Sequence, residues 1–289
     1  MTRVESTPPS RSVYPYYRAH VVRAQRVTPH VVRVSFGGDD LTGFARELPD
    51  QYVKLFFPLS GQTVPAVPVL TDDDVAGWYQ RYLAMPDDIR PVMRTLTVRR
   101  HRAETGEVDV DFVLHGDGGP ASRWAMRAQP GDQVGILTAQ GLYLPPDTAQ
   151  WQLIAGDETA LPAIGAIGAI VESMPPTTRA LVFVEVAGGA GEQPLDTPED
   201  VQLRWVHRGA IPAGRSDALL DAVRGATFPE GPHYAWIAGE ARAVRVLRRH
   251  LVNDRGFDKA AITFTGYWRL GKTEVEEYTP EELEELQST

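Results

Sequence analysis

No cysteine occurs among the 289 residues of the chain. This absence excludes disulfide bonds, thiolate zinc sites, iron–sulfur clusters and cysteine nucleophiles. The seven histidines are scattered without the spacing of metal ligands, so no metal site is predicted, and a serine–histidine–acid arrangement for hydrolysis has little support. Any redox chemistry must therefore come from a bound cofactor.

The sequence also lacks an apolar run long enough to span a membrane, and residues 1–12 lack the basic-then-apolar pattern of a secretory signal. We therefore expect a cytoplasmic protein without a membrane span. Positive charge is in the minority, with 29 Lys and Arg against 38 Asp and Glu, which argues against nucleic-acid binding. Residues 273–289 hold seven Glu and neither Lys nor Arg, so this tail carries most of the imbalance and a basic cleft elsewhere is compatible with it.

The length exceeds the size at which one hydrophobic core usually stops growing, so we expect two domains, residues 1–148 and 149–289. In the first half, short apolar stretches separated by turns are typical of a barrel or sandwich. The predicted strands cover residues 32–36, 52–57, 94–99, 108–114 and 134–137. Residues 60–91 are interpreted as an insertion between strands, with a short helix near 74–83.

The second half alternates apolar runs with helical windows, which is the pattern of a parallel sheet with helices on its faces. Strands are predicted at 151–155, 181–186, 203–206, 234–238 and 261–264, and helices at 160–173, 216–224 and 240–253. Gly165 and Gly168 are expected to let the first of these helices lie close to the sheet.

A glycine-rich segment at 115–119 connects a predicted strand to a helix. Pro120 suits the first helical turn, and Ala121, Trp124 and Ala125 give the helix an apolar face. Free amide groups and the positive end of the dipole make such a helix start a candidate anion site. The alternative is an ordinary connection between a strand and a helix.

Two Arg and two Thr residues alternate across the predicted strand at 94–99. One face holds Arg94, Leu96 and Val98, and the other holds Thr95, Thr97 and Arg99. Arginine binds phosphate oxygens bidentately, and a threonine hydroxyl can bond a flavin ring nitrogen or a ribityl oxygen. A plain surface strand is the alternative interpretation.

Two strand-to-helix turns in the second half are candidates for nucleotide binding, because a doubly wound sheet binds nucleotides at the carboxyl ends of its strands. They contain Gly156, Asp157, Glu158 and Thr159 after the first strand, and Gly239 and Glu240 after the fourth. The glycine fingerprint GxGxxG is absent. Asp157 and Glu158 are alternatively residues that cap a helix.

An aromatic and basic loop follows the last predicted strand. Tyr267 and Trp268 stand beside Arg269 and Lys272, a combination that suits a planar ring or a bulky anion. The alternative is that this loop packs the end of the chain against the barrel.

Taken in order, these segments resemble the siderophore-interacting protein family of FAD-dependent ferric-siderophore reductases, within the ferredoxin-reductase superfamily. The resemblance runs from about Tyr17 to Lys272. It is carried by the strings at 28–34, 52–58, 94–99, 115–124, 156–163, 236–240 and 266–269.

The resemblance implies a six-stranded antiparallel β-barrel that carries FAD, followed by a doubly wound α/β domain for NADPH or NADH. It assigns the flavin to the 94–99 strand and the pyrophosphate to the turn at 119–122. The implied cofactor residues are Arg94, Thr95, Leu96, Thr97, Val98, Arg99, His115, Gly119, Pro120, Ala121, Ser122 and Trp124, with Gly156, Asp157, Glu158, Thr159, Gly239 and Glu240 for the nucleotide. A basic triad for an anionic ferric chelate maps onto Lys54, Arg127 and Arg269, with Arg123 as an alternative to Arg127.

The chain departs from the family pattern at Leu96, where the family usually has an aromatic residue. An aromatic ring stacked on a flavin helps to hold it and to tune its potential. Leucine can still pack flat against the ring, so FAD remains the predicted cofactor.

The resemblance implies a cytoplasmic reductase that passes electrons from a nicotinamide nucleotide, or a reduced electron-carrier protein, to a ferric siderophore and releases Fe(II). Two alternatives stay open: a reductase of the same fold acting on free flavin, quinone or another acceptor, and a siderophore-binding protein without redox turnover. For the donor, Arg208, Arg242 and Arg245 suit a 2′-phosphate and favour NADPH, whereas Glu185 suits a ribose hydroxyl.

Overall fold

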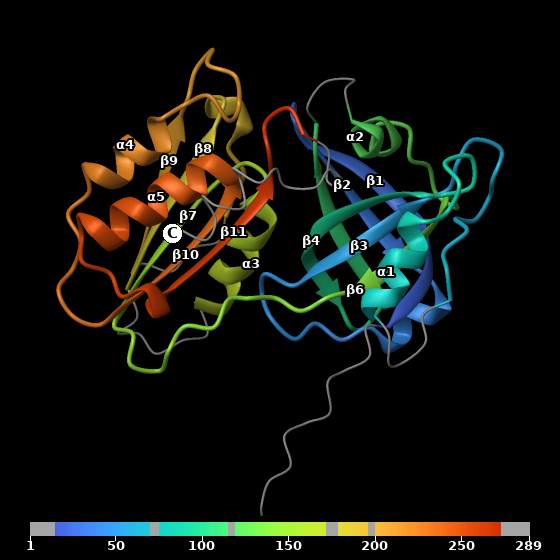
Figure 1. The fold of residues 1–289 in the computed structure, drawn as a ribbon, viewed down its shortest axis with the longest axis horizontal. Coiled ribbons are helices and arrows are strands. Elements are labelled where there is room, and N and C mark those ends of the chain that lie inside the picture. The colour runs from blue at the N-terminus through green and yellow to red at the C-terminus, as the bar shows by residue number, and fades with distance from the viewer. Residues whose placement is uncertain (1–14, 70–74, 115–118, 172–178, 196–199, 273–289) are drawn as a thin grey trace, which may run out of the picture.

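The computed structural model describes residues 15–69, 75–114, 119–171, 179–195 and 200–272. Two lobes lie side by side, a β-barrel and a sheet covered by helices (Figure 1). His115 is the one predicted site residue outside the described residues. No helix in the described ranges has the length and apolar character needed to cross a membrane.

The first lobe is a closed antiparallel barrel with strand order β1-β2-β5-β4-β3-β6, which confirms the predicted six-stranded barrel. Its strands are β1 (Tyr16–Thr28), β2 (Val31–Gly37), β3 (Tyr52–Phe57), β4 (Val92–Arg102), β5 (Glu107–Val113) and β6 (Gln133–Thr138). Sequence reasoning missed β1. Its inward alternation ends at Val21, because the register against β2 shifts between Val21 and Arg23.

The inner face of the barrel is apolar and its outer face is partly ionic. Along β5, Val108, Val110 and Phe112 belong to the barrel core, and the alternate residues Asp109 and Asp111 face outward. Both carboxylates are nonetheless buried. Long side chains from neighbouring strands therefore cover them.

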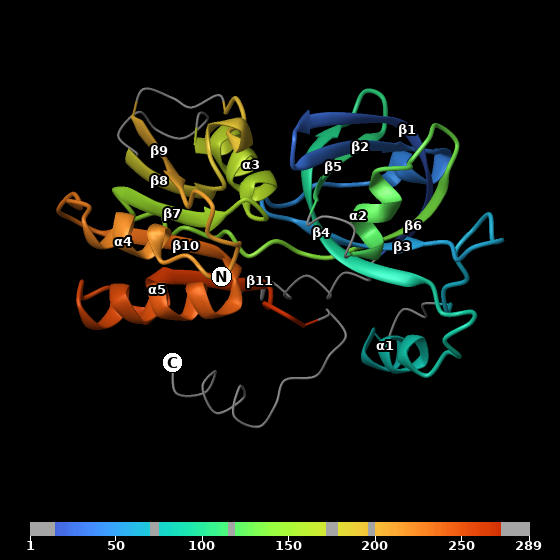
Figure 2. The same cartoon turned by 90° about the horizontal axis from the view of Figure 1, so that it is seen from above.

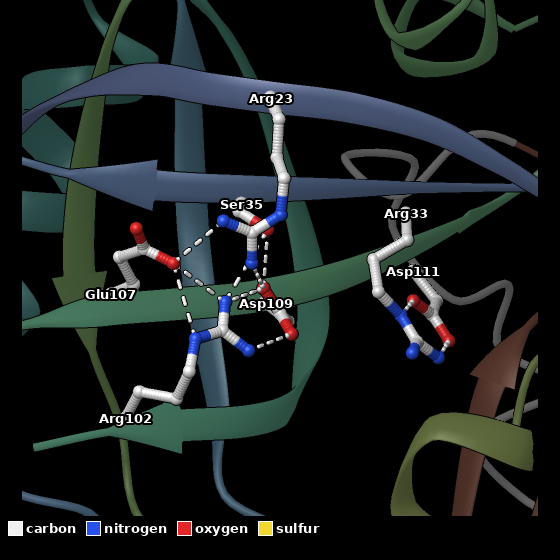
Figure 3. Close-up of polar contacts among 7 residues, drawn as sticks. All are labelled: Arg23, Arg33, Ser35, Arg102, Glu107, Asp109 and Asp111. Atoms are coloured by element: carbon white, nitrogen blue, oxygen red, sulfur yellow. Dashed lines mark hydrogen bonds and ion pairs between the residues drawn. The ribbon is translucent and has the colours of Figure 1, made fainter. Parts of the chain in front are cut away.

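Those side chains form the ion-pair cluster drawn in Figure 3, which comprises Arg23, Arg33, Ser35, Arg102, Glu107, Asp109 and Asp111. Arg102 donates to both carboxylate oxygens of Asp109, at 2.6 Å each, and Ser35 donates to the same carboxylate. Arg33 binds Asp111 bidentately at 2.6 and 2.8 Å. The cluster links β1, β2, β4 and β5 across the outside of the barrel.

Two short helices pack on the barrel. In α1 (Val75–Leu83), Trp78 and Tyr82 pack with Phe56 and Met93 on the outside of the wall, which confirms the helix predicted in the insertion. In α2 (Pro120–Ala125), Trp124 packs against the barrel core.

The second lobe is a parallel five-stranded sheet with order β11-β10-β7-β8-β9, a doubly wound arrangement, as predicted. Its strands are β7 (Trp151–Asp157), β8 (Arg179–Val186), β9 (Val201–His207), β10 (His233–Glu240) and β11 (Ile262–Trp268). The helix α3 (Leu161–Val171) covers one face, and α4 (Ala218–Arg224) and α5 (Ala241–Asn253) cover the other (Figure 2). Short 3-10 turns occur at η1 (Asp39–Gly43), η3 (Gly189–Gly191) and η4 (Lys259–Ala261).

The two lobes meet where β4 contacts α3. An added Cβ at Gly165 would lie 2.6 Å from Nη2 of Arg99. The expected role of Gly165 is therefore corrected, because this glycine makes room for an arginine of the barrel rather than for the sheet.

A buried carboxylate also joins the lobes. Asp50, just before β3, accepts hydrogen bonds from the amides of Leu142 and Tyr143 in the connection between the lobes. Its other oxygen accepts from Nε1 of Trp236 in β10 at 2.9 Å. Three donors from outside the barrel strands therefore converge on one side chain.

Candidate cofactor and substrate site

The two faces of β4 point into different surroundings. Leu96 and Val98 pack toward the barrel core, and Val98 is fully buried, so its side chain is not available to a ligand. Thr95, Thr97 and Arg99 lie on the opposite face, as the alternation predicts. Along this face, Thr95 is exposed and Thr97 is buried.

The outer face of β4 brings residues of both lobes together. Lys54 of β3 is paired in register with Thr95 and donates from Nζ to its hydroxyl oxygen at 3.1 Å. Thr97 shares a side-chain hydrogen bond with Tyr267 at the end of β11, and burial raises the pKa of Tyr267 well above its usual value. Arg269 follows Tyr267 by two residues. Lys54 and Arg269 therefore belong to segments that both contact this face.

The helix α2 packs on β5 and β4 of the barrel. Gly119 is the N-cap residue and provides no capping side chain, and Pro120 takes the first helical position. Among the described residues, an added Cβ at Gly119 would meet the Ser122 hydroxyl at 3.6 Å and nothing else within 4 Å. Ser122 donates to the carbonyl oxygen of Val113, so its own hydroxyl holds the helix to β5.

Partly buried apolar side chains border this helix start. They pack on the barrel core and retain exposed surface; they include Leu96, Leu114, Ala121 and Trp124. Arg94 lies two residues before Leu96 on the same face of β4 and donates from Nη1 to the carbonyl oxygen of Met93. Partly buried apolar side chains, a helix start without a side-chain cap among the described residues, and a guanidinium thus occur on β4 and α2, which are in contact.

Arg127, the predicted middle member of the basic triad, is exposed just beyond α2, and its alternative Arg123 is exposed within α2. The place of Arg127 in the triad stays a prediction.

At the carboxyl edge of the sheet, Asp157 acts as a hydrogen-bonding hub. Its carboxylate accepts from the Thr159 amide, the Glu240 amide and Nε1 of Trp268, each at 2.9 Å. Burial raises the pKa of Asp157, and these hydrogen bonds oppose the shift. Asp157 therefore ties the turn after β7 to the ends of β10 and β11, and its role as a helix cap stays a prediction, because neither amide that it accepts from lies within α3 or α5.

Glu158 and Glu240 are also engaged with the protein itself. Glu158 binds Arg208 bidentately at 2.6 and 2.8 Å. Glu240 is the N-cap of α5 and accepts from the amides of Arg242 and Ala243. Arg208, expected as a phosphate ligand, is therefore held by a carboxylate.

A pocket opens at this edge, between the ends of β7, β8 and β10 and the starts of α4 and α5. The charged residues that line it are Asp157, Glu185, Asp217, Glu240 and Arg242. It lies beside the point where the strand order reverses, which is the usual ligand position in such sheets.

Comparison with known proteins decides the family. The model of the siderophore-interacting FAD-binding domain matches residues 20–143, and that of the siderophore-interacting protein matches residues 149–271. The chain belongs to the siderophore-interacting protein family. As a member of it, the protein is an FAD-containing oxidoreductase with a ferredoxin-reductase-like fold.

Individual relatives are similar over nearly the whole chain. The ferric vibriobactin reductase ViuB of Vibrio cholerae is 33% identical, over 88% of this chain and 89% of its own. The NADPH-dependent ferric-chelate reductase of Escherichia coli is 28% identical, over 86% and 91%. The crystal structure of a siderophore utilization protein from T. fusca superposes with a TM-score of 0.79 at 36% identity, covering 92% of this chain and 97% of that one.

The residues at the barrel end fit FAD, the cofactor of this siderophore-interacting protein. The isoalloxazine ring needs an apolar surface, which Leu96 and its neighbours provide, and the pyrophosphate needs free amides and a cation, for which α2 and Arg94 are suited. Sequence reasoning gave no role to Asp50, and it named Tyr267 without its partner Thr97. Both act through contacts between residues far apart in the chain, which no local pattern signals.

Proposed function

We propose that this protein reduces ferric siderophores with electrons from a nicotinamide nucleotide and releases iron as Fe(II). The observation that carries the proposal is the convergence of both lobes on the outer face of β4, through Lys54 with Thr95 and Tyr267 with Thr97. The similarity to the ferric vibriobactin reductase of Vibrio cholerae and to the ferric-chelate reductase of Escherichia coli supports it.

FAD, when bound, supplies the conversion between a two-electron donor and a one-electron acceptor. Arg94 and the start of α2 would hold its pyrophosphate, and Leu96 would pack on its ring. Thr97, on the opposite face of β4, shares its hydrogen bond with Tyr267 and so joins this strand to the second lobe. No side-chain acid or base is required, because the chemistry is electron transfer.

The basic residues attract the substrate. Lys54 donates to Thr95 on the outer face of β4, and Arg269 lies two residues after Tyr267, which hydrogen-bonds Thr97 on the same face. Two positive charges at this place favour an anionic ferric chelate over a neutral one. Hard oxygen ligands hold Fe(III) far more tightly than Fe(II), so reduction alone releases the metal without hydrolysis of the siderophore.

An anaerobic absorption experiment tests the proposed function. The flavin bands of the purified protein should bleach on addition of a nicotinamide nucleotide and return when a ferric siderophore is added with an Fe(II) trap present. Appearance of the Fe(II) complex in step with the returning bands supports the proposal. Bleached bands that persist in the presence of several ferric siderophores would contradict it and would favour another acceptor.

Removal of the basic residues should weaken chelate binding. We expect Lys54→Ala and Arg269→Ala each to raise the Michaelis constant for an anionic ferric chelate by about tenfold, with flavin content unchanged. Steady-state kinetics with an Fe(II) trap measures the constant. Arg26→Ala, which removes an exposed barrel arginine elsewhere, is the matched control. Unchanged kinetics in both site variants would remove these residues from the substrate site.

A further inference from the structure

The carboxyl edge of the second lobe bears on which nicotinamide nucleotide the protein uses. β7 lies at the centre of the sheet, and α3 leaves it on one face while α5 follows β10 on the other. The pocket at the ends of β7, β8 and β10 is therefore the position where the fold receives a dinucleotide. The charged residues that line this pocket therefore bear on whether it accepts NADH or NADPH.

The lining of this pocket is acidic. Among the described residues around it, Asp157, Glu185, Asp217 and Glu240 carry carboxylates, and Arg242 is the basic one. A 2′-phosphate brings about two further negative charges, which this lining repels, whereas a ribose hydroxyl donates hydrogen bonds that carboxylates accept.

Helix starts at this edge are already capped by the protein. Glu240 accepts from two amides of the first turn of α5, and Glu185 accepts from the amide of Leu219 in α4. These amides are the groups that commonly bind a phosphate at a helix N-terminus. A phosphate there would have to displace a carboxylate.

Arg208, one of the arginines that suit a 2′-phosphate, is neutralised; it interacts with the pocket carboxylates Asp157 and Glu185 without being part of the pocket lining itself. Arg208 directly follows β9 and Glu158 directly follows β7, so their bidentate ion pair spans the end of β8 between them. The two side chains are only 8% and 11% exposed. Separating a buried ion pair leaves an uncompensated charge and is costly, so Arg208 is not available to a ligand.

We propose that this pocket selects NADH over NADPH, and that the Glu158–Arg208 pair is the specificity determinant. The inference rests on the proposed function, because it concerns the electron donor of that reaction. The proposed donor differs from that of the NADPH-dependent ferric-chelate reductase of Escherichia coli. Glu185 is the carboxylate placed to accept from the unmodified ribose.

Binding of redox-inactive fragments tests the inference without turnover. Calorimetric titration of the full FAD-loaded chain should show ADP-ribose binding at least about tenfold more tightly than its 2′-phosphate derivative. Glu158→Gln keeps the side-chain size and releases Arg208. This variant should shift the ratio of the two affinities toward the phosphorylated ligand by about tenfold.

Glu192→Gln is the matched control. Glu192 contacts His207, the residue next to Arg208, and it lies at a half-exposed site outside the pocket. The affinity ratio of this variant should equal that of the parent. Equal or tighter binding of the phosphorylated ligand by the parent overturns the inference, and so does an unchanged ratio in a folded Glu158→Gln protein. The parent ratio decides the matter even if the variant does not fold.

Failure of the inference and failure of the proposed function are distinguishable. If neither fragment binds, this pocket is not the donor site and the inference falls. Protein reduced with dithionite should still pass electrons to a ferric chelate in that case, and only the loss of this reaction would overturn the ferric-reductase function.

Discussion

Replacement of Asp50 by alanine is expected to lower the free energy of unfolding by about 3 kcal/mol or more. The Asp50 carboxylate is 4% exposed and accepts hydrogen bonds from Leu142, Tyr143 and Trp236. Alanine leaves three donors without this acceptor, two of them in the buried residues Tyr143 and Trp236, and each uncompensated buried donor costs about 1–3 kcal/mol. Urea denaturation followed by circular dichroism measures the change.

A control in the same region separates this effect from a general loss of charge. Asp147→Ala removes an exposed carboxylate from the connection that Asp50 contacts, and it should change stability by less than about 0.5 kcal/mol. Trp236→Phe removes one of the three donors and leaves Asp50 with two. A denaturation midpoint for Asp50→Ala equal to that of Asp147→Ala would show that the buried carboxylate does not hold the lobes together.

Asp109→Ala should destabilise the barrel by about 3 kcal/mol at neutral pH. The Asp109 side chain is 4% exposed and binds both terminal nitrogens of Arg102. Removing the Asp109 carboxylate leaves the half-buried guanidinium of Arg102 with one fewer negatively charged partner. Thermal or urea unfolding at pH 7 measures the loss, and Asp221→Ala, at an exposed ion pair on α4, is the control and should be nearly neutral.

The Asp109 carboxylate also makes the stability of the protein depend on pH in the acidic range. Burial by itself would raise the pKa of Asp109, but hydrogen bonds from Arg102 and Ser35 outweigh it and hold the pKa below its usual value. A depressed folded-state pKa contributes stability above the unfolded pKa of about 4, and this contribution is lost as the pH falls through the folded value. Asp109→Asn should therefore be less sensitive to pH below 4 than the parent. Parallel stability curves for the two proteins in that range would contradict the assignment.

Much of the architecture follows from the sequence alone. Residues 108–112 alternate strictly between apolar and polar, as in strands buried on one face, and this pattern predicted the barrel. After residue 150, apolar runs alternate with helical windows, as in strands buried on both faces, and this pattern predicted the parallel sheet. β1 escaped prediction because its register shift breaks the alternation after Val21. The family also followed from the sequence, through strings spread along both halves.

Only the tertiary structure decided what the individual polar residues contact. Asp50 with Trp236, Thr97 with Tyr267, and Glu158 with Arg208 are each separated by tens of residues or more in the chain. A local pattern reports periodicity, and so it placed Glu158 and Arg208 at strand ends without showing that one neutralises the other. Charge pairing depends on distances of a few ångströms between elements, which are fixed by how the strands are ordered and packed in the folded molecule.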